Sequence, residues 1–271
     1  MRTETIALWE VTPGTTESVV PYLVHYTPDE AKTTAAVLII PGSGYFHLPS
    51  NPVQEGARVA EYLCREGMHV FVLIYRVAPD AYPDPLLDGR RAMRYIRYHA
   101  AKLGIDKGRI CTLGYSAGGH LASTLTGYRA PLAGEGADEI DREAYAPDLQ
   151  ALCYPVISLD CSKPYTHKGS AQYLLLDRYD ELYASLCMDT AAEGTLPPTF
   201  LYHNFDDASV GVENSLLYAA RLKALGASVE MHIYPHGGHG IGLPNVPRHD
   251  LDHDKAWIGL YVAWLRYNDF L

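Results

Sequence analysis

Several features that would assign a chain to a particular class are missing from this sequence. No apolar run approaches the roughly 18 residues that span a bilayer, and residues 1–6 lack the apolar core of a signal peptide. The five cysteines are odd in number and form no Cys-x-x-Cys pair, which disfavours redox and zinc motifs. We therefore expect a cytoplasmic protein, in which Cys111 and Cys153 lie within apolar strand patterns as buried thiols.

Positive charge is also scarce. Lysine and arginine total 22 against 32 aspartates and glutamates, a formal net charge of -10 at pH 7. This balance disfavours nucleic acid and anionic membranes as partners and favours a small neutral molecule. A homo-oligomer is compatible with it. The series Arg90, Arg91, Arg94 and Arg97 has helical spacing, and we interpret it as a solvated helix face.

With 48% hydrophobic and only 20% charged residues, the chain is long enough and apolar enough for one large domain with a substantial core. Strand and helix patterns alternate along it, as in an α/β domain. Residues 5–11 and 18–26 alternate around Pro13-Gly14 and indicate an antiparallel pair. Later strands are short apolar runs of the kind buried on both faces. Strands are predicted at 36–40, 70–75, the run before Ser116, 150–156, 199–203 and 229–234, and helices at 53–65, 86–103, 212–225 and 255–267. The order predicts an α/β fold with a mostly parallel eight-stranded sheet, an antiparallel N-terminal strand pair, and helices on both faces.

Two stretches interrupt this alternation, at residues 130–149 and 158–198. Insertions between core strands commonly build a substrate cover, which we expect of both. The sequence shows no internal repeat, low-complexity tract or second domain, so residues 1–271 are predicted to form a single domain.

The most informative motif is Gly114-Tyr115-Ser116-Ala117-Gly118, which follows an apolar strand and runs into a helix-forming segment. At a sharp strand-to-helix turn the serine needs unusual backbone angles, and side chains at positions 114 and 118 would collide with neighbouring chain. The turn presents the serine hydroxyl as a nucleophile. The helix that begins there directs free N–H groups, including that of Ala117, toward a developing oxyanion.

A serine hydroxyl needs a base, and the base needs an acid that orients it. In this motif context the expected chain order is serine, acid, histidine. The strand at 229–234 leads into Pro-His236-Gly-Gly-His239-Gly, where the glycines leave room for the imidazole of His239 to reach another loop. We favour His239 as the base and keep His236 as an alternative.

The acid is expected in the loop after the strand at 199–203. Asp207 is favoured, with Asp206 and Asp160 as alternatives. An aspartate at this position would also suit the N-terminus of the following helix, which is the purely structural interpretation of Asp207. Because the carboxyl ends of parallel strands meet at one sheet edge, both loops should lie beside the serine turn.

A second oxyanion donor is expected from the loop Pro41-Gly42-Ser43-Gly44-Tyr45, which follows a buried strand. A simple turn and the start of a dinucleotide fingerprint are the alternatives. His47 occupies the place of the third glycine in that fingerprint and disfavours it. Aromatic loop residues are candidates for lining the substrate pocket; these are Tyr45, Phe46, Tyr115 and Tyr165.

Residues 249–254 contain His249 and His253 with carboxylates between them, but not in the His-Glu-x-x-His spacing of a zinc helix. Acids at a helix start interact favourably with its dipole, so we interpret this run as a solvated helix entry. We expect no metal and no organic cofactor.

Together these motifs resemble the α/β-hydrolase superfamily: Pro41-Gly-Ser-Gly-Tyr45, Tyr75-Arg-Val-Ala-Pro79, Gly114-Tyr-Ser-Ala-Gly-Gly-His120, Val212-Glu-Asn-Ser215 and Ile233-Tyr-Pro-His-Gly-Gly-His-Gly240. The sequence is most similar to the acetyl esterase and acetyl-xylan-esterase-like (lipase/esterase-like) branch, which is related to the hormone-sensitive-lipase group. The resemblance implies Ser116 as nucleophile, Asp207 as acid and His239 as base, with oxyanion donors from Ala117 and from Ser43 or Gly44.

Two positions depart from the family pattern. The His-Gly-Gly-Gly of lipase-like relatives is Pro41-Gly42-Ser43-Gly44 here, and the proline often found after the acid-loop valine is Gly211, which we expect to loosen that loop. The resemblance implies a serine carboxylesterase that removes short acyl groups, especially acetyl, from an alcohol such as a sugar. Alternatives are an amide, peptide or formamide hydrolase with the same triad, and a non-catalytic binding protein of this fold.

Overall fold

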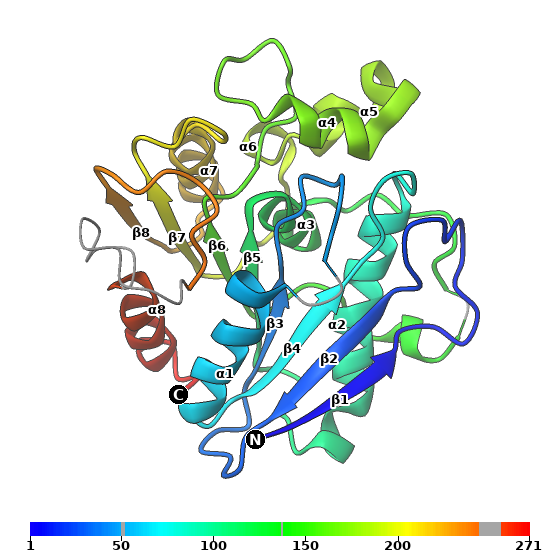
Figure 1. Ribbon diagram of the computed structural model, residues 1–271, viewed down its shortest axis with the longest axis vertical. Coiled ribbons are helices and arrows are strands. Elements are labelled where there is room, and N and C mark those ends of the chain that lie inside the picture. Colours follow the sequence, from blue (N-terminus) through cyan, green and yellow to red (C-terminus); the bar gives the residue numbers. More distant parts are fainter. Residues whose placement is uncertain (50–51, 137, 244–255) are drawn as a thin grey trace.

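The computed structural model describes residues 1–49, 52–136, 138–243 and 256–271. Within them the chain forms one eight-stranded sheet in the order β1-β2-β4-β3-β5-β6-β7-β8 (Figure 1). The strands are β1 (Arg2–Ala7), β2 (Tyr22–Thr27), β3 (Ala36–Ile40), β4 (His69–Ile74), β5 (Ile110–Tyr115), β6 (Leu149–Cys153), β7 (Thr199–Asn204) and β8 (Val229–Tyr234).

The six neighbouring strands β4-β3-β5-β6-β7-β8 pair in parallel, whereas β2 pairs antiparallel with both β1 and β4. The register places Ile40 opposite Gly114 and Tyr115 opposite Cys153, so the strand ends that precede the glycine loop and the serine turn are adjacent. The predicted sheet, with its antiparallel N-terminal pair, is confirmed.

Helices cover both faces of the sheet. In Figure 1, α1 (Arg58–Arg65) and α8 (Ala256–Tyr267) lie on one face, and α2 (Asp84–Leu103), α3 (Ser116–Gly127) and α7 (Glu213–Ala224) lie on the other. Successive side chains of each strand point to opposite faces of the sheet. Val37 and Ile39 pack with α1 and α8, whereas Leu38 and Ile40 join the core beneath α2 and α3. A strand buried on both faces therefore appears as a continuous apolar run.

The N-terminal strands lie elsewhere than predicted, at Arg2–Ala7 and Tyr22–Thr27 rather than 5–11 and 18–26. The segment between them is a loop docked against the start of α2. The backbone N–H groups of Glu17 and Ser18 donate to the Asp80 carboxylate at 3.1 and 2.9 Å, and Thr15 donates to Asp84. These hydrogen bonds to buried carboxylates replace strand pairing, and sequence alternation cannot reveal them.

Other boundaries shift by smaller amounts. The first predicted helix begins as a π-helical turn at Val53–Ala57 before α1. Strand β6 ends at Cys153 rather than at residue 156, because Tyr154 has a φ of 38° and turns the chain out of the sheet.

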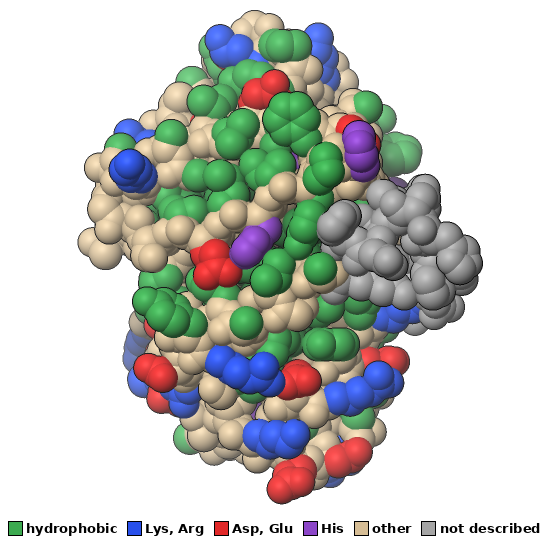
Figure 2. Space-filling model, turned by 90° about the vertical axis from the view of Figure 1, so that its left-hand side faces the viewer, with side chains coloured by type: hydrophobic (Ala, Val, Ile, Leu, Met, Phe, Trp, Pro, Cys, Tyr) green, Lys and Arg blue, Asp and Glu red, His purple; other side chains and the backbone are tan. Residues whose placement is uncertain are grey.

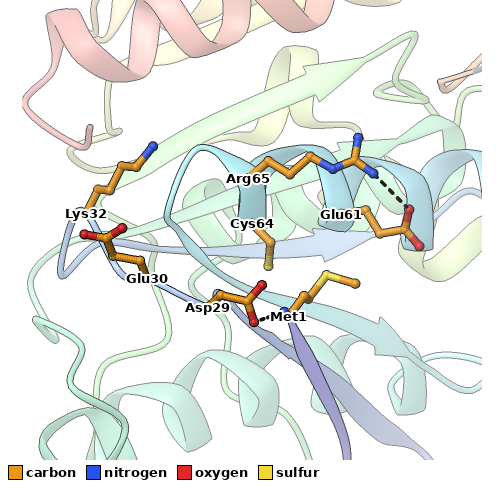
Figure 3. Close-up of a pocket in the computed structure, with 7 residues that line it drawn as sticks. All are labelled: Met1, Asp29, Glu30, Lys32, Glu61, Cys64 and Arg65. Carbon is orange, nitrogen blue, oxygen red and sulfur yellow. Dashed lines mark hydrogen bonds and ion pairs between the residues drawn. The ribbon is translucent and has the colours of Figure 1, made fainter.

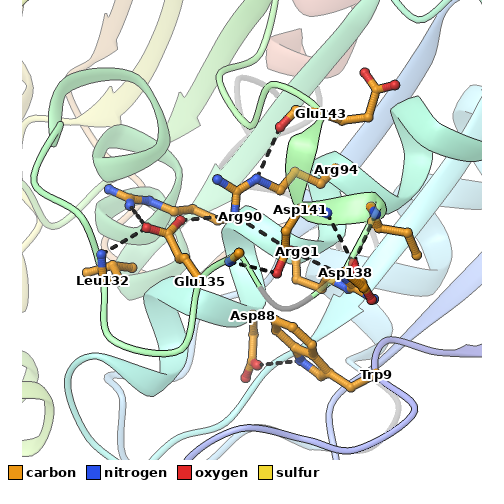
Figure 4. A network of polar contacts seen from close by, with 12 residues as sticks. Trp9, Asp88, Arg90, Arg91, Arg94, Leu132, Glu135, Asp138, Asp141 and Glu143 are labelled. Atoms are coloured by element: carbon orange, nitrogen blue, oxygen red, sulfur yellow. Dashed lines mark hydrogen bonds and ion pairs between the residues drawn. The ribbon is translucent and has the colours of Figure 1, made fainter.

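Residues 130–149 do not cover the sheet edge where the serine lies, contrary to expectation. Residues 130–136 and 138–149 run along α2 toward its C-terminal end, with a short 3₁₀ turn at Ile140–Arg142 (Figure 4). Arg91 contacts both Asp138 and Asp141, at 2.6 and 3.0 Å, and Glu135 bridges the two neighbouring arginines of the helix. The predicted solvated face is therefore wrong. Four helix arginines are buried under this acidic segment; they are Arg90, Arg91, Arg94 and Arg97.

Residues 158–198 form the helical layer above the carboxyl ends of the strands in Figure 1, with α4 (Lys168–Leu175), a 3₁₀ turn at Leu176–Arg178, α5 (Tyr179–Leu186) and α6 (Met188–Ala191). The layer is tied down from below: the Leu186 carbonyl lies 2.8 Å from Nε2 of buried His120, and Met188 N–H donates to the Ile157 carbonyl at 3.1 Å. Among the helices described, none is long and apolar enough to cross a membrane.

Candidate active site

The serine turn has the strained geometry that its glycines predict. Ser116 has a φ of 51°, a left-handed conformation that is uncommon outside glycine. A Cβ on Gly118 would lie 2.2 Å from the Ile40 carbonyl oxygen, and one on Gly114 would lie 2.6 Å from the Gly118 carbonyl oxygen. Glycine at both positions lets β3, β5 and α3 approach closely enough to force the turn. Ser116 begins α3, so the N–H of Ala117 belongs to its first turn, which has no intrahelical partners.

The structure brings the three predicted residues into one chain of hydrogen bonds. Ser116 Oγ lies 2.8 Å from His239 Nε2, and His239 Nδ1 lies 2.6 Å from Asp207 Oδ2. They come from three separate loops, after β5, β8 and β7. A carboxylate at Nδ1 holds the proton on that nitrogen and leaves the Nε2 lone pair facing the serine hydroxyl, the arrangement required to accept its proton.

Asp207 is held on every side. Its Oδ1 accepts the N–H groups of Ser209 and Val210, both at 2.9 Å, and Oδ2 also lies 3.3 Å from Nε2 of buried His203. Burial by itself would raise the pKa of Asp207, but the hydrogen bonds from His203, His239 and Val210 outweigh burial and hold that pKa well below its usual value. Asp207 therefore stays ionised beside His239.

The alternative residues lie outside this chain of hydrogen bonds. Asp206 accepts the Gly238 N–H at 2.9 Å and lies near His236, whose side chain is 77% exposed, so this pair braces the outside of the histidine loop. Asp160 caps a local turn through Ser162 and pairs with Lys163.

The loop between β3 and the first helix has two N–H groups available as oxyanion donors. Gly42 N–H donates to Glu55 Oε2 at 2.7 Å, and Tyr45 N–H donates to Ser43 Oγ at 2.9 Å. The N–H groups of Ser43 and Gly44 have no hydrogen-bond partner in the described part of the chain. A Cβ on Gly42 would lie 2.9 Å from the Ser116 Cβ, so this loop lies directly against the serine.

A partly buried carboxylate joins that loop to the histidine loop. Glu55 Oε1 accepts the Tyr154 hydroxyl at 2.8 Å, and that hydroxyl accepts the Gly242 N–H at 2.8 Å. The Tyr154 ring meets the His239 ring edge to face, with centroids 5.0 Å apart. Burial raises the pKa of Glu55, and the hydrogen bonds from Tyr154 and Gly42 offset part of that rise.

Sequence motifs did not identify Glu55, Tyr154 or His203 as part of this site. Glu55 lies in a segment that resembles an ordinary amphipathic helix, and Tyr154 resembles the end of an apolar strand. His203 is the exception, because its position at the end of the strand before Asp207 is a signal that sequence reasoning could have used. The acid loop is held more firmly at Gly211 than predicted. The Gly211 N–H donates to the Tyr165 carbonyl at 3.1 Å, and a Cβ at position 211 would lie 2.6 Å from the Tyr165 Cβ.

Two of the four aromatic candidates are wrong as pocket-lining residues. Tyr45 and Tyr115 are fully buried. The hydroxyl of Tyr45 lies 2.9 Å from His120 Nδ1, and the ring of Tyr115 packs on Trp257, so both side chains turn into the core. Phe46 is 59% exposed, with its ring 4.7 Å from that of Tyr173 on α4, and Tyr165 is partly buried.

A second candidate site, at the opposite end of the sheet, lacks comparable chemistry. A pocket of about 410 Å³ lies at the amino ends of the strands, between the N-terminus and α1 (Figure 3). Burial raises the pKa of its Cys64 thiol to about 12, which makes that thiol unreactive at neutral pH. Within the described ranges no group of three His, Cys, Asp or Glu side chains is arranged to hold a metal. Residues 249–254, with His249 and His253, lie outside the described residues.

Comparison with known proteins identifies the family of this chain. The family model described as BD-FAE matches residues 23–222. The chain is 40% identical to the acetyl ester-xyloside bifunctional hydrolase of Caldicellulosiruptor lactoaceticus, whose crystal structure superposes with a TM-score of 0.88 over 99% of this chain and 97% of that one.

Two curated relatives are more distant. Endo-1,4-beta-xylanase B of Butyrivibrio fibrisolvens is 30% identical over 83% of this chain, and the acetylxylan esterase of Xylanibacter ruminicola is 28% identical over 77% of it. The matched regions are only 35% and 41% of those two proteins, so this chain corresponds to a part of each.

Proposed function

Since this chain belongs to the BD-FAE family and has the α/β-hydrolase fold, we propose that it is a serine esterase that hydrolyses short acyl esters through Ser116, His239 and Asp207. The observation that carries the proposal is the 2.8 Å contact of Ser116 Oγ with His239 Nε2, with Asp207 on the opposite nitrogen of the ring. That contact supplies a base for a hydroxyl that is otherwise a poor nucleophile.

The reaction runs in two halves. Ser116 Oγ attacks the ester carbonyl carbon while His239 takes its proton, and the resulting oxyanion is stabilised by the N–H groups of Ala117 and of Ser43 or Gly44. Collapse of the tetrahedral species breaks the bond to the alcohol oxygen, which receives the proton from His239. Water then attacks the acyl-enzyme with His239 again as base, and releases the carboxylic acid and Ser116. No step requires a metal or an organic cofactor.

We assign an acetylated sugar as the substrate class. Support comes from the relatives, since one is an acetylxylan esterase and another an acetyl ester-xyloside hydrolase. On the face of the molecule in Figure 2, side chains of both signs are interspersed and no large patch of one sign is seen, which fits a neutral substrate. A net charge of -10 gives no attraction for an acidic ligand.

The test compares the wild-type protein with Ser116→Ala on p-nitrophenyl acetate. The variant is expected to lose activity by a factor of about a thousand or more, while its circular dichroism spectrum is unchanged. A fluorophosphonate probe should label the wild-type protein at Ser116 and leave the variant unlabelled. Activity retained in the variant, or a folded wild-type protein that the probe does not label, would contradict the mechanism. A panel of acetylated sugars, aryl esters and anilides then separates esterase from amidase activity.

A further inference from the structure

A second histidine, His167, faces the candidate active site, although no sequence motif singled it out. It lies at the start of α4, in the helical layer above the strand ends, and its side chain is partly buried. A Cβ on Gly44 would lie 3.6 Å from His167 Cε1, so the imidazole sits over the loop that carries the candidate oxyanion donors. His167 is also close enough to His239 and Asp207 to feel the charge of both.

The hydrogen bonds of His167 fix which ring nitrogen carries the proton. The backbone N–H of Ser170 points at His167 Nδ1 at 3.2 Å, and the Ser170 hydroxyl lies 2.8 Å from the same atom. A backbone N–H can only donate, so Nδ1 must be the unprotonated acceptor and Nε2 carries the hydrogen. Nε2 has no hydrogen-bond partner within the described part of the chain.

A backbone N–H that donates to Nδ1 favours the neutral form of the His167 ring. Burial lowers the pKa of His167, proximity to His239 lowers it further, and Asp207 acts in the opposite direction. A neutral imidazole with its Nδ1 already occupied is neither a base nor a cation. It is a single N–H donor in a fixed position, which suits an uncharged oxygen atom of a ligand.

The position of the donor indicates which part of an ester it meets. The carbonyl oxygen of the bound ester points toward the N–H groups of Ala117 and the Gly44 loop, and the alcohol oxygen points toward His239, which returns the proton. His167 lies against that loop and close enough to His239 to feel its charge. Because the alcohol oxygen lies beside His239, a donor next to both groups is positioned for other oxygen atoms of the alcohol.

We propose that His167 is a specificity-determining residue whose Nε2–H donates a hydrogen bond to an oxygen on the alcohol part of the substrate, such as a second hydroxyl of a sugar that carries the ester. This inference rests on the proposed esterase function and narrows it to polyhydroxylated alcohols. An alcohol without such an oxygen leaves the donor unsatisfied, which costs binding energy in the transition state.

The experiment uses two acetates that give the same acetyl-enzyme, methyl xyloside monoacetate and cyclohexyl acetate. They share a six-membered ring on the alcohol side, but only the xyloside offers further oxygen atoms. The variant His167→Asn keeps a side chain that caps α4 and removes the imidazole donor. His167→Ser, which also caps helices, is measured alongside in case one variant fails to fold. His47→Ala, at an exposed histidine of the neighbouring loop, is the matched control.

We expect kcat/KM for the xyloside acetate to fall about tenfold in the His167 variants, while kcat/KM for cyclohexyl acetate changes less than twofold. The control should leave both unchanged. An equal fall for the two esters, or no fall for either, would overturn the inference and leave the esterase proposal standing. If the wild-type protein hydrolyses neither ester and is not labelled by a fluorophosphonate, the proposed function itself fails and the inference with it.

Discussion

Glu55 Oε2 accepts the backbone N–H of Gly42 at 2.7 Å, and this bond removes one of the donors that the glycine loop could offer to an oxyanion. Because that N–H is occupied, the loop presents its next two N–H groups instead. The other oxygen of Glu55 holds Tyr154, which in turn holds the loop after His239. One partly buried carboxylate therefore joins the two loops that must keep a fixed distance from Ser116.

Glu55 should make stability depend on pH in a predictable direction. Burial raises the pKa of Glu55 in the folded protein above its unfolded value of 4.5, so folding takes up a proton. The stability contributed by this group is present below the unfolded pKa and is lost as pH rises through the folded pKa. The free energy of unfolding of Glu55→Gln should therefore rise relative to that of the wild-type protein as pH rises above about 4.5.

Urea unfolding at pH 4.5 and pH 8 measures that difference. Glu61→Gln, at a partly exposed glutamate of the following helix that lies 4.0 Å from Arg65, is the control. A difference between wild type and Glu55→Gln that stays constant or moves in the opposite direction would contradict the assignment.

Replacing the acid should reduce turnover far more than it reduces stability. In Asp207→Asn the amide can no longer hold the proton on His239 Nδ1 as the carboxylate does, and kcat for p-nitrophenyl acetate should fall by about 10³ to 10⁴. Asp206→Asn and Asp160→Asn are matched controls from outside the hydrogen-bonded chain, and each should keep kcat within about threefold. A severe loss in either control with an active Asp207→Asn would reassign the acid.

The close approach at the serine turn predicts a sharp contrast between two glycines. In Gly118→Ala the new Cβ would meet the Ile40 and Pro41 carbonyl oxygens at 2.2 and 2.4 Å, both backbone atoms that cannot move independently. The free energy of unfolding should fall by at least about 2 kcal/mol. Gly259 in α8 has nothing within 4 Å of an added Cβ, and Gly259→Ala should raise it by up to about 1 kcal/mol. Thermal and urea unfolding of both variants tests this contrast.

The buried arginines of α2 should affect stability and leave catalysis alone. Arg91→Ala would remove the 3.0 Å ion pair from Asp141, whose side chain is fully buried, and should cost about 3 kcal/mol of folding free energy. Because this cluster runs away from the serine along α2, kcat/KM of the folded variant should stay within about twofold. Arg65→Ala removes a mostly exposed pair with Glu61 at 4.0 Å and should cost about 0.5 kcal/mol or less. A large loss of kcat/KM in folded Arg91→Ala would show that residues 130–149 do act on the site.

The sequence alone determined the parts of this protein that depend on local chemistry. Buried parallel strands are continuous apolar runs, the serine turn requires glycine at positions 114 and 118, and the loops after β7 and β8 necessarily meet that turn at one sheet edge. For that reason Ser116, Asp207 and His239 could be named before any contact was known, and the structure places them within hydrogen-bond distance.

Tertiary structure decided what lies between those elements. Whether Arg91 is solvated or buried depends on where an acidic segment 47 to 50 residues later packs. The N-terminal loop likewise depends on Asp80 and Asp84, which lie more than 60 residues after it. Burial of Tyr45 and Tyr115, and the links from Glu55 and His167 to the glycine loop, join residues that are neighbours only after folding. Periodicity and motif spacing each describe a single segment of the chain. Neither shows which distant segment will pack against it.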